Sequence, residues 1–217
     1  YFVRAGNAAG LSSAVGPVAG QRRVANVGEA VWVFPTGGAV GSAASMGTDG
    51  TAYFGAADGN MYAVDGAGQL RWSYTFGGAS STAPAVGPDG TVYFAATTTR
   101  YPSPSTNALF ALDTAGQLRW KILVPEESIN SPAISADGTL YFAFANRMFA
   151  ISPAGSNLWT YTTGRGFYQT PAIGADGTIY CGTGDGYLVA VANDGTMLWE
   201  CNTGDGYIKT PVIGDNG

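Results

Sequence analysis

Carboxylates are the most frequent side chains in this sequence that could carry out acid–base or metal chemistry. The chain has 15 Asp and Glu residues, but nine of the 11 Asp residues stand directly before a glycine. Asp-Gly pairs are turn formers, because Gly adopts positive φ at little steric cost. Glu126 and Glu127 are adjacent, so on an extended segment their side chains point to opposite faces. The acids therefore indicate turns, and we assign no residue to catalysis, to a cofactor or to a metal.

Nucleophilic chemistry is limited by the absence of histidine. This excludes His-ligated metal sites, Ser-His-Asp and Cys-His systems and c-type haem attachment. The two cysteines, Cys181 and Cys201, take positions that hold Phe or Tyr in other copies of the repeat described below. We therefore expect two buried thiols that act as small apolar side chains, with a disulfide as the alternative.

The composition predicts an all-β protein. Hydrophobic residues make up 46% of the 217 residues and charged residues 12%, and there are 33 glycines, a balance that suits short strands joined by tight turns. The net charge of −5 argues against a nucleic-acid partner, which needs a positive surface. No apolar run reaches the roughly 20 residues of a transmembrane helix. No signal peptide is visible at Tyr1, but the chain opens within a strand-like segment, so an upstream signal stays open.

The five tryptophans reveal an internal repeat. They follow one another at steps of 40, 48, 39 and 40 residues, as Trp32, Trp72, Trp120, Trp159 and Trp199. An Asp-Gly-Thr turn signal recurs with them, at 49–51, 89–91, 137–139 and 176–178. Self-similarity at this period marks a propeller or a solenoid.

Each repeat is long enough for four short strands. In the second repeat we expect strands at 83–87, 91–96, 109–113 and 117–124. We expect the Asp-Gly pair between the first two strands to form a type I′ hairpin turn, in which both central residues have positive φ. Helical periodicity is nowhere sustained.

The segment between the third and fourth strands carries a family motif. Residues 63–72 and 111–120 share the pattern Ala-x-Asp-x-x-Gly-x-x-x-Trp, with Asp65 and Asp113 at its acidic position, whereas Ser152 and Ala192 replace the Asp in the later copies. This pattern resembles the tryptophan-docking motif of pyrroloquinoline-quinone-like, or quinoprotein dehydrogenase-like, β-propellers. The resemblance covers residues 32–217. It implies that the five tryptophans, with Asp65 and Asp113, dock each blade onto the next.

The resemblance also implies the architecture. We expect a β-propeller of four-stranded antiparallel blades, with four complete blades and a ring that is incomplete, since the family usually closes with seven or eight. Residues 32–36 would be a fourth strand without the preceding three, and residues 210–217 a first strand with none after it.

The N-terminal stretch differs from the repeats. Residues 1–12 resemble the penultimate strand and following turn of a fibronectin type III domain, and the alternative is an unrelated leading strand. We therefore divide the chain into a fibronectin-like remnant at 1–18, a linker at 19–31 and propeller repeats at 32–217, truncated at the C-terminus.

Differences between the repeats collect on one face. The turns from strand 1 to 2 and from strand 3 to 4 are nearly identical and share one end of the blades, whereas the strand 2 to 3 turns and the blade-to-blade loops share the other. The largest departure is an insertion of about eight residues within 97–107. Exposed Arg and aromatic side chains commonly anchor interfaces; the alternative is that these loops vary because nothing constrains them. The binding candidates on this face are Arg100, Tyr101, Glu126, Glu127, Asn130, Arg165, Phe167, Tyr168, Gln169, Tyr207 and Lys209.

These features favour a non-catalytic binding scaffold. We expect an extracellular, cell-surface or periplasmic bacterial protein that binds a protein or a polysaccharide and needs no cofactor. A similarity to the propeller scaffold of the outer-membrane β-barrel assembly machinery supports this role. The alternative is part of a quinoprotein dehydrogenase that holds pyrroloquinoline quinone over calcium and oxidises alcohols or aldose sugars. The adjacent cysteine pair of those enzymes is absent from this sequence, as is the Lys of their docking motif.

Overall fold

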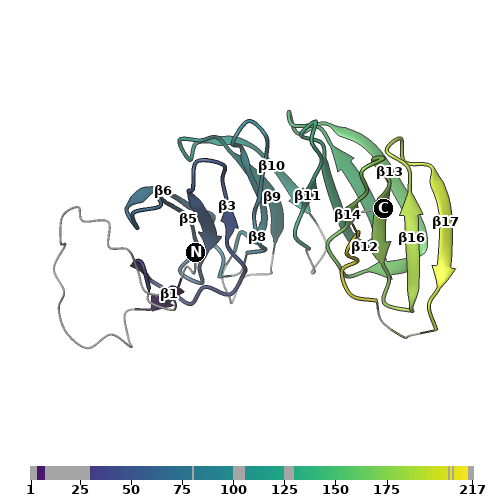
Figure 1. Ribbon diagram of the computed structural model, residues 1–217, viewed down its shortest axis with the longest axis horizontal. Helices are drawn as coiled ribbons and strands as arrows, with labels where there is room; N and C mark the ends of the chain where they lie inside the picture. Colours follow the sequence, from purple (N-terminus) through teal and green to yellow (C-terminus); the bar gives the residue numbers. More distant parts are fainter. Residues whose placement is uncertain are drawn as a thin grey trace.

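The computed structural model describes residues 4–7, 30–79, 81–99, 106–124, 130–204, 206 and 208–214. These residues form strands and turns only, and none of them belongs to a helix that could cross a membrane. Four antiparallel sheets follow one another in chain order along an arc (Figure 1), as expected for the blades of a propeller. We number them blades 1 to 4.

Blades 1 and 2 are four-stranded meanders, in which each strand pairs with the next one in the chain. Each begins with a two-residue inner strand and ends with a longer, more exposed outer strand. The strands of blade 1 are β3 (Ser45–Met46), β4 (Ala52–Gly55), β5 (Asn60–Val64) and β6 (Leu70–Thr75). Those of blade 2 are β7 (Ala85–Val86), β8 (Val92–Thr97), β9 (Asn107–Leu112) and β10 (Leu118–Val124).

Blades 3 and 4 repeat this plan, with one change in blade 3. The strands of blade 3 are β11 (Ala133–Ile134), β12 (Leu140–Ile151) and β13 (Asn157–Phe167). The first half of β12 pairs with β11 and its second half with β13, so β12 supplies both middle positions of the blade. The strands of blade 4 are β14 (Ala172–Ile173), β15 (Ile179–Gly182), β16 (Tyr187–Val191) and β17 (Met197–Asn202).

A parallel pair of strands precedes blade 1. Strand β1 (Arg4–Asn7) pairs with β2 (Val33–Thr36), and the register joins Arg4 to Val33 and Asn7 to Thr36. Strand β2 begins directly after Trp32, as the fourth-strand assignment of this segment expects. Residues 208–214 form no strand, so the first strand expected at 210–217 is not seen over its described part.

The hairpin turns correct one expectation. At the first Asp-Gly turn, Gly50 has a φ of 79°, but Ala145 is the only non-glycine residue with positive φ in the described ranges, so Asp49 has negative φ. The Gly47 carbonyl accepts from Gly50 N at 3.0 Å, and Gly47 N donates to Thr51 O at 2.8 Å. This is a three-residue loop, a type I turn followed by a left-handed glycine, and not a type I′ turn. Asp49 contributes through its Oδ1 atom, which accepts from Thr51 N at 3.0 Å.

The hydrophobic core lies between the blades. The second and third strands of each blade are mostly buried, whereas the fourth strands are largely exposed. The main apolar clusters combine residues of two neighbouring blades, such as Leu109 with Phe142 and Met148 with Val189. Each blade therefore depends on its neighbours to bury its apolar faces.

Candidate functional site

Four tryptophans, Trp32, Trp72, Trp120 and Trp159, each pack against the blade that follows them in the chain. Each ring lies on the glycine of the following blade's strand 3 to 4 turn, and a Cβ built on those glycines would meet the ring at 2.6 to 2.9 Å. Three indoles also donate a hydrogen bond across the interface. These bonds run from Trp72 Nε1 to Thr114 O at 3.0 Å, from Trp120 Nε1 to Pro153 O at 2.9 Å and from Trp159 Nε1 to Asn193 O at 2.7 Å.

The two aspartates of the motif shape the turn that receives the tryptophan. Asp65 Oδ1 accepts from the backbone N–H groups of Ala67 and Gln69, both at 2.9 Å, and Asp113 makes the same two bonds at 2.9 Å. Ser152 provides part of this in blade 3, where its Oγ accepts from Ser156 N at 3.1 Å. The two carboxylates thus stabilise their own turns, and the indole hydrogen bonds go to backbone carbonyl groups instead of to these carboxylates.

Five of the eleven binding candidates lie outside the described residues: Arg100, Tyr101, Glu126, Glu127 and Tyr207. Of the others, Lys209 is exposed, and Tyr168 is 48% exposed, with its ring against Gly166 and Gly184. These two side chains remain accessible to a partner.

Four candidates are held by contacts within the chain. Phe167 is only 1% exposed and belongs to the core between blades 3 and 4, because β13 continues through it instead of giving way to a loop. Asn130 Nδ2 donates to Ala143 O at 2.7 Å, and Gln169 Oε1 accepts from Thr210 Oγ1 at 3.1 Å. Phe167 is therefore a packing residue, which corrects its place on the binding face.

Arg165, the fourth of these, connects blade 3 to blade 4. Its guanidinium pairs with Asp185 and, at 3.3 Å, with Glu200, and it stacks on the Tyr187 ring with its Cζ 3.3 Å from the centroid. The hydrogen bond to Glu200, together with the pairing to Asp185, raises the pKa of Arg165 above its ordinary value. The charge of Arg165 is thus already neutralised within the chain. Arg165 also lines a polar pocket of about 420 Å³, and it is the only cationic residue among the described residues of that pocket, so the pocket offers a ligand no unpaired cation.

The two thiols have different surroundings. Cys181 is buried, and burial raises its pKa to about 12, so it stays protonated at neutral pH. Cys201 is exposed on β17, which corrects the expectation of two buried thiols, and both cysteines are unpaired. Across the described parts of the chain, no three cysteine or carboxylate side chains come together in a way that could hold a metal ion.

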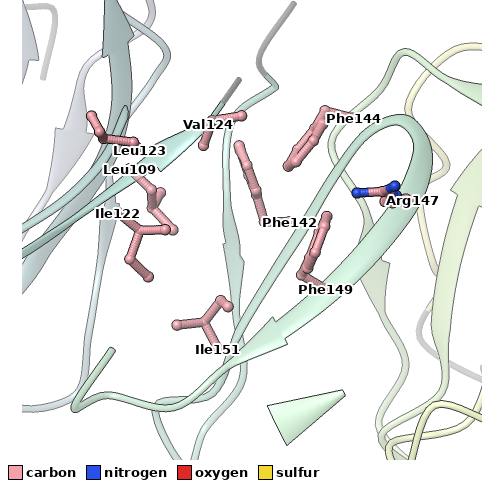
Figure 2. Close-up of a pocket in the computed structure, with 9 residues that line it drawn as sticks. All are labelled: Leu109, Ile122, Leu123, Val124, Phe142, Phe144, Arg147, Phe149 and Ile151. Atoms are coloured by element: carbon pink, nitrogen blue, oxygen red, sulfur yellow. The ribbon is translucent and has the colours of Figure 1, made fainter. Parts of the chain in front are cut away.

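An apolar pocket between blades 2 and 3 escaped the sequence-based candidates. It has a volume of about 190 Å³, and its apolar walls include Leu109 and Ile122 of blade 2 and Phe142 and Phe149 of blade 3. Figure 2 shows these side chains around one space, with Arg147 beside Phe149. Its sequence signal is the residue two places after the tryptophan. This residue is aromatic after three tryptophans, as Phe34, Tyr74 and Tyr161, but it is Ile122 at this interface and Cys201 after the last tryptophan.

Comparisons with known proteins agree with this architecture. The family model described as outer membrane protein assembly factor BamB matches residues 21–171. No curated protein matches the chain. Among solved structures, BamB from Moraxella catarrhalis is similar with a TM-score of 0.61 and 18% identity, over 77% of this chain and 54% of that one.

Two further structures share the fold. The quinohemoprotein alcohol dehydrogenase of Comamonas testosteroni has a TM-score of 0.61 and 16% identity, over 76% of this chain and 35% of the enzyme. A protein of unknown function from Bacteroides caccae has a TM-score of 0.52 and 16% identity, over 76% of this chain and 61% of that one. The chain thus spans about half the length of the BamB structure, and less of the enzyme.

Proposed function

The chain belongs to the outer membrane protein assembly factor BamB family, and from that premise we propose that it is a non-catalytic scaffold that binds a protein partner. The family match over residues 21–171 is the observation that carries this proposal. The partner would bind on the face that holds the strand 2 to 3 turns and the blade-to-blade segments. The family's name, which refers to the outer membrane, supports a bacterial extracellular, cell-surface or periplasmic location, and a fibronectin-like remnant at residues 1–18 would suit a multidomain chain there.

The distribution of side chains supports this face. The opposite end of the blades carries turns whose Asp and Gly residues are occupied in backbone hydrogen bonds. The proposed face instead offers exposed side chains of the types that anchor interfaces. Those described are Tyr168 and Lys209, with Leu123 at 69% exposure near the end of β10.

A quinoprotein dehydrogenase is the second candidate function, favoured by the fold shared with the quinohemoprotein alcohol dehydrogenase. The described residues do not fit its cofactors, since they bring no three carboxylate or cysteine ligands together and hold Cys181 buried but Cys201 exposed. We test this candidate by adding pyrroloquinoline quinone and calcium, with alcohols and aldose sugars as substrates and an artificial electron acceptor. Turnover would contradict the non-catalytic role.

Site-specific photocrosslinking in the bacterial periplasm tests the binding face. A benzophenone amino acid replaces Tyr168 on the proposed face, and a matched chain carries it at Gln117, an exposed residue of a strand 3 to 4 turn. We expect a defined protein adduct from position 168 and none from position 117. Equal adducts from both positions, or adducts from 117 alone, would place the partner elsewhere. If position 168 reacts only when polysaccharide is present, the partner is a glycan instead of a protein.

A further inference from the structure

The interface between blades 2 and 3 lacks an aromatic ring that the other interfaces contain. Between blades 1 and 2, Tyr74 follows Trp72 by two residues and packs edge-on against Phe110, with ring centroids 6.0 Å apart and an interplanar angle of 65°. Phe34, at the same position before blade 1, packs on Tyr62 at 5.6 Å and 62°. The equivalent residue of blade 2 is Ile122, which faces the aromatic Phe149 without a ring of its own.

A second position at the same interface holds a smaller side chain than its equivalent between blades 1 and 2. Phe76, four residues after Trp72, packs on Phe94 at 5.8 Å between blades 1 and 2. Its equivalent in blade 2 is Val124. Between blades 3 and 4 the corresponding space is filled by Tyr161 and Phe167, with centroids 6.5 Å apart. The two small side chains of blade 2 thus leave a slot where the neighbouring interfaces place aromatic rings.

The slot has the size and lining of a site for one ring. Its volume is about 190 Å³, compared with the roughly 150 Å³ of an engineered apolar cavity that binds benzene. Phe144 and Phe149 stack at 5.0 Å and 17° along one wall, and Phe142 lies 5.1 Å from Phe144. An entering ring can therefore meet Phe149 edge-on, as Tyr74 meets Phe110.

A cation stands at the edge of the slot. Arg147 lines the pocket and is exposed, and it lies two residues before Phe149 on β12, so the two side chains share a face of the strand. None of the ion pairs found among the described residues includes Arg147. It differs in this from Arg71, Arg119 and Arg165, which are each paired with a carboxylate.

We propose that this slot binds a small carboxylic acid with a single aromatic ring, the ring between Ile122 and Phe149 and the carboxylate on Arg147. The apolar walls provide the binding energy and Arg147 the preference for an anion. The proposal does not rest on the partner-binding role, because it requires no second protein, and Leu123 both lines the pocket and belongs to the proposed face.

Fluorine NMR titration with 4-fluorophenylacetate tests the site, with 4-fluorophenylacetamide as the neutral isostere. We expect saturable binding of the acid and about threefold weaker binding of the amide, the size of effect that one exposed ion pair gives. The Ile122→Tyr variant introduces the residue found in two other repeats and should weaken binding of the acid at least tenfold. The Arg147→Gln variant should bind the acid and the amide equally.

The folding of each variant is followed by thermal unfolding. If Ile122→Tyr does not fold, Val124→Phe, which copies Phe76, takes its place as the filled variant. Binding that is unchanged in the filled variant would overturn the site, as would a wild-type chain that shows no saturable binding or no preference for the acid. A third probe, acetyl-Phe-Asp-amide, shows whether the slot takes the aromatic side chain of a polypeptide or a small aromatic acid. If only this peptide binds, the slot receives a polypeptide side chain and the small-molecule proposal fails.

Discussion

The tryptophans of blades 1 to 3 and the tryptophan of blade 4 occupy the same position in their outer strands but have different environments. All four contact a tyrosine of their own blade, with ring centroids 5.7 or 5.8 Å apart. Trp72, Trp120 and Trp159 also lie on the next blade and donate a hydrogen bond to it. Trp199 makes no such bond within the described residues and is 42% exposed. The repeat therefore determines where the tryptophan lies in its blade, whereas the contact with the following blade determines how much that tryptophan stabilises the fold.

Replacing the docked and the undocked tryptophan gives the largest expected difference. Trp120→Ala removes the contact with Gly155 and the hydrogen bond to Pro153, and we expect a loss of about 3 to 5 kcal/mol in the free energy of unfolding. Trp199→Ala loses mainly its contact with Tyr180, for about 1 kcal/mol. Urea denaturation of both variants checks this. Equal losses would mean that docking adds nothing to the contact within the blade.

The receiving glycine can be tested without touching a tryptophan. Gly116 and Gly50 have nearly the same φ, 78° and 79°, but a Cβ at Gly116 would lie 2.6 Å from the Trp72 ring, whereas a Cβ at Gly50 meets nothing within 4 Å. Gly50→Ala should cost about 1 to 2 kcal/mol through backbone strain alone. Gly116→Ala should cost about 1 to 3 kcal/mol more, because the ring must move. Thermal unfolding that ranks Gly50→Ala as the worse variant would contradict the docking geometry.

The smallest effect is expected from the arginines. Arg165→Gln removes pairs that join blade 3 to blade 4, whereas Arg119→Gln removes a pair with Asp89 inside blade 2. Salt screens exposed pairs, so both variants should lose less stability at high salt than at low salt. Limited proteolysis separates them, since only Arg165→Gln should speed cleavage in blade 4. Equal cleavage of the two variants would show that Arg165 adds nothing between the blades.

The repeated tryptophans and Asp-Gly turns, together with the family resemblance, predict the four blades and their antiparallel pairing, but not the continuous β12 of blade 3. The turn type was predicted wrongly, because Asp49 keeps a negative φ and stabilises the turn through its side chain, leaving positive φ to Gly50 alone. Cys201 is exposed, whereas Tyr74 and Tyr161 at the same repeat position are half-buried. Repeat position therefore predicts an element but not its burial.

The candidate site was less accessible to sequence reasoning. The sequence predicts that Arg165 and Phe167 lie among the loops of the face where the repeats differ, but β13 extends to Phe167 and the core between blades 3 and 4 includes Phe167. The change from Tyr to Ile at position 122 was visible in the repeat. Whether Ile122 leaves a pocket depends on how Phe142, Phe144 and Phe149 pack around it. The spacing of residues in the sequence does not predict that packing.

Hydrogen exchange of the indole N–H groups tests the central claim most directly. Each indole signal is assigned in a ¹H–¹⁵N spectrum by a single Trp→Phe substitution, and the exchange rates are compared in one sample. The hydrogen bonds to Thr114, Pro153 and Asn193 predict slow exchange for Trp72, Trp120 and Trp159 and fast exchange for Trp199. Exchange at Trp199 as slow as at the other three, or fast exchange at all four, would contradict docking of each blade through its tryptophan.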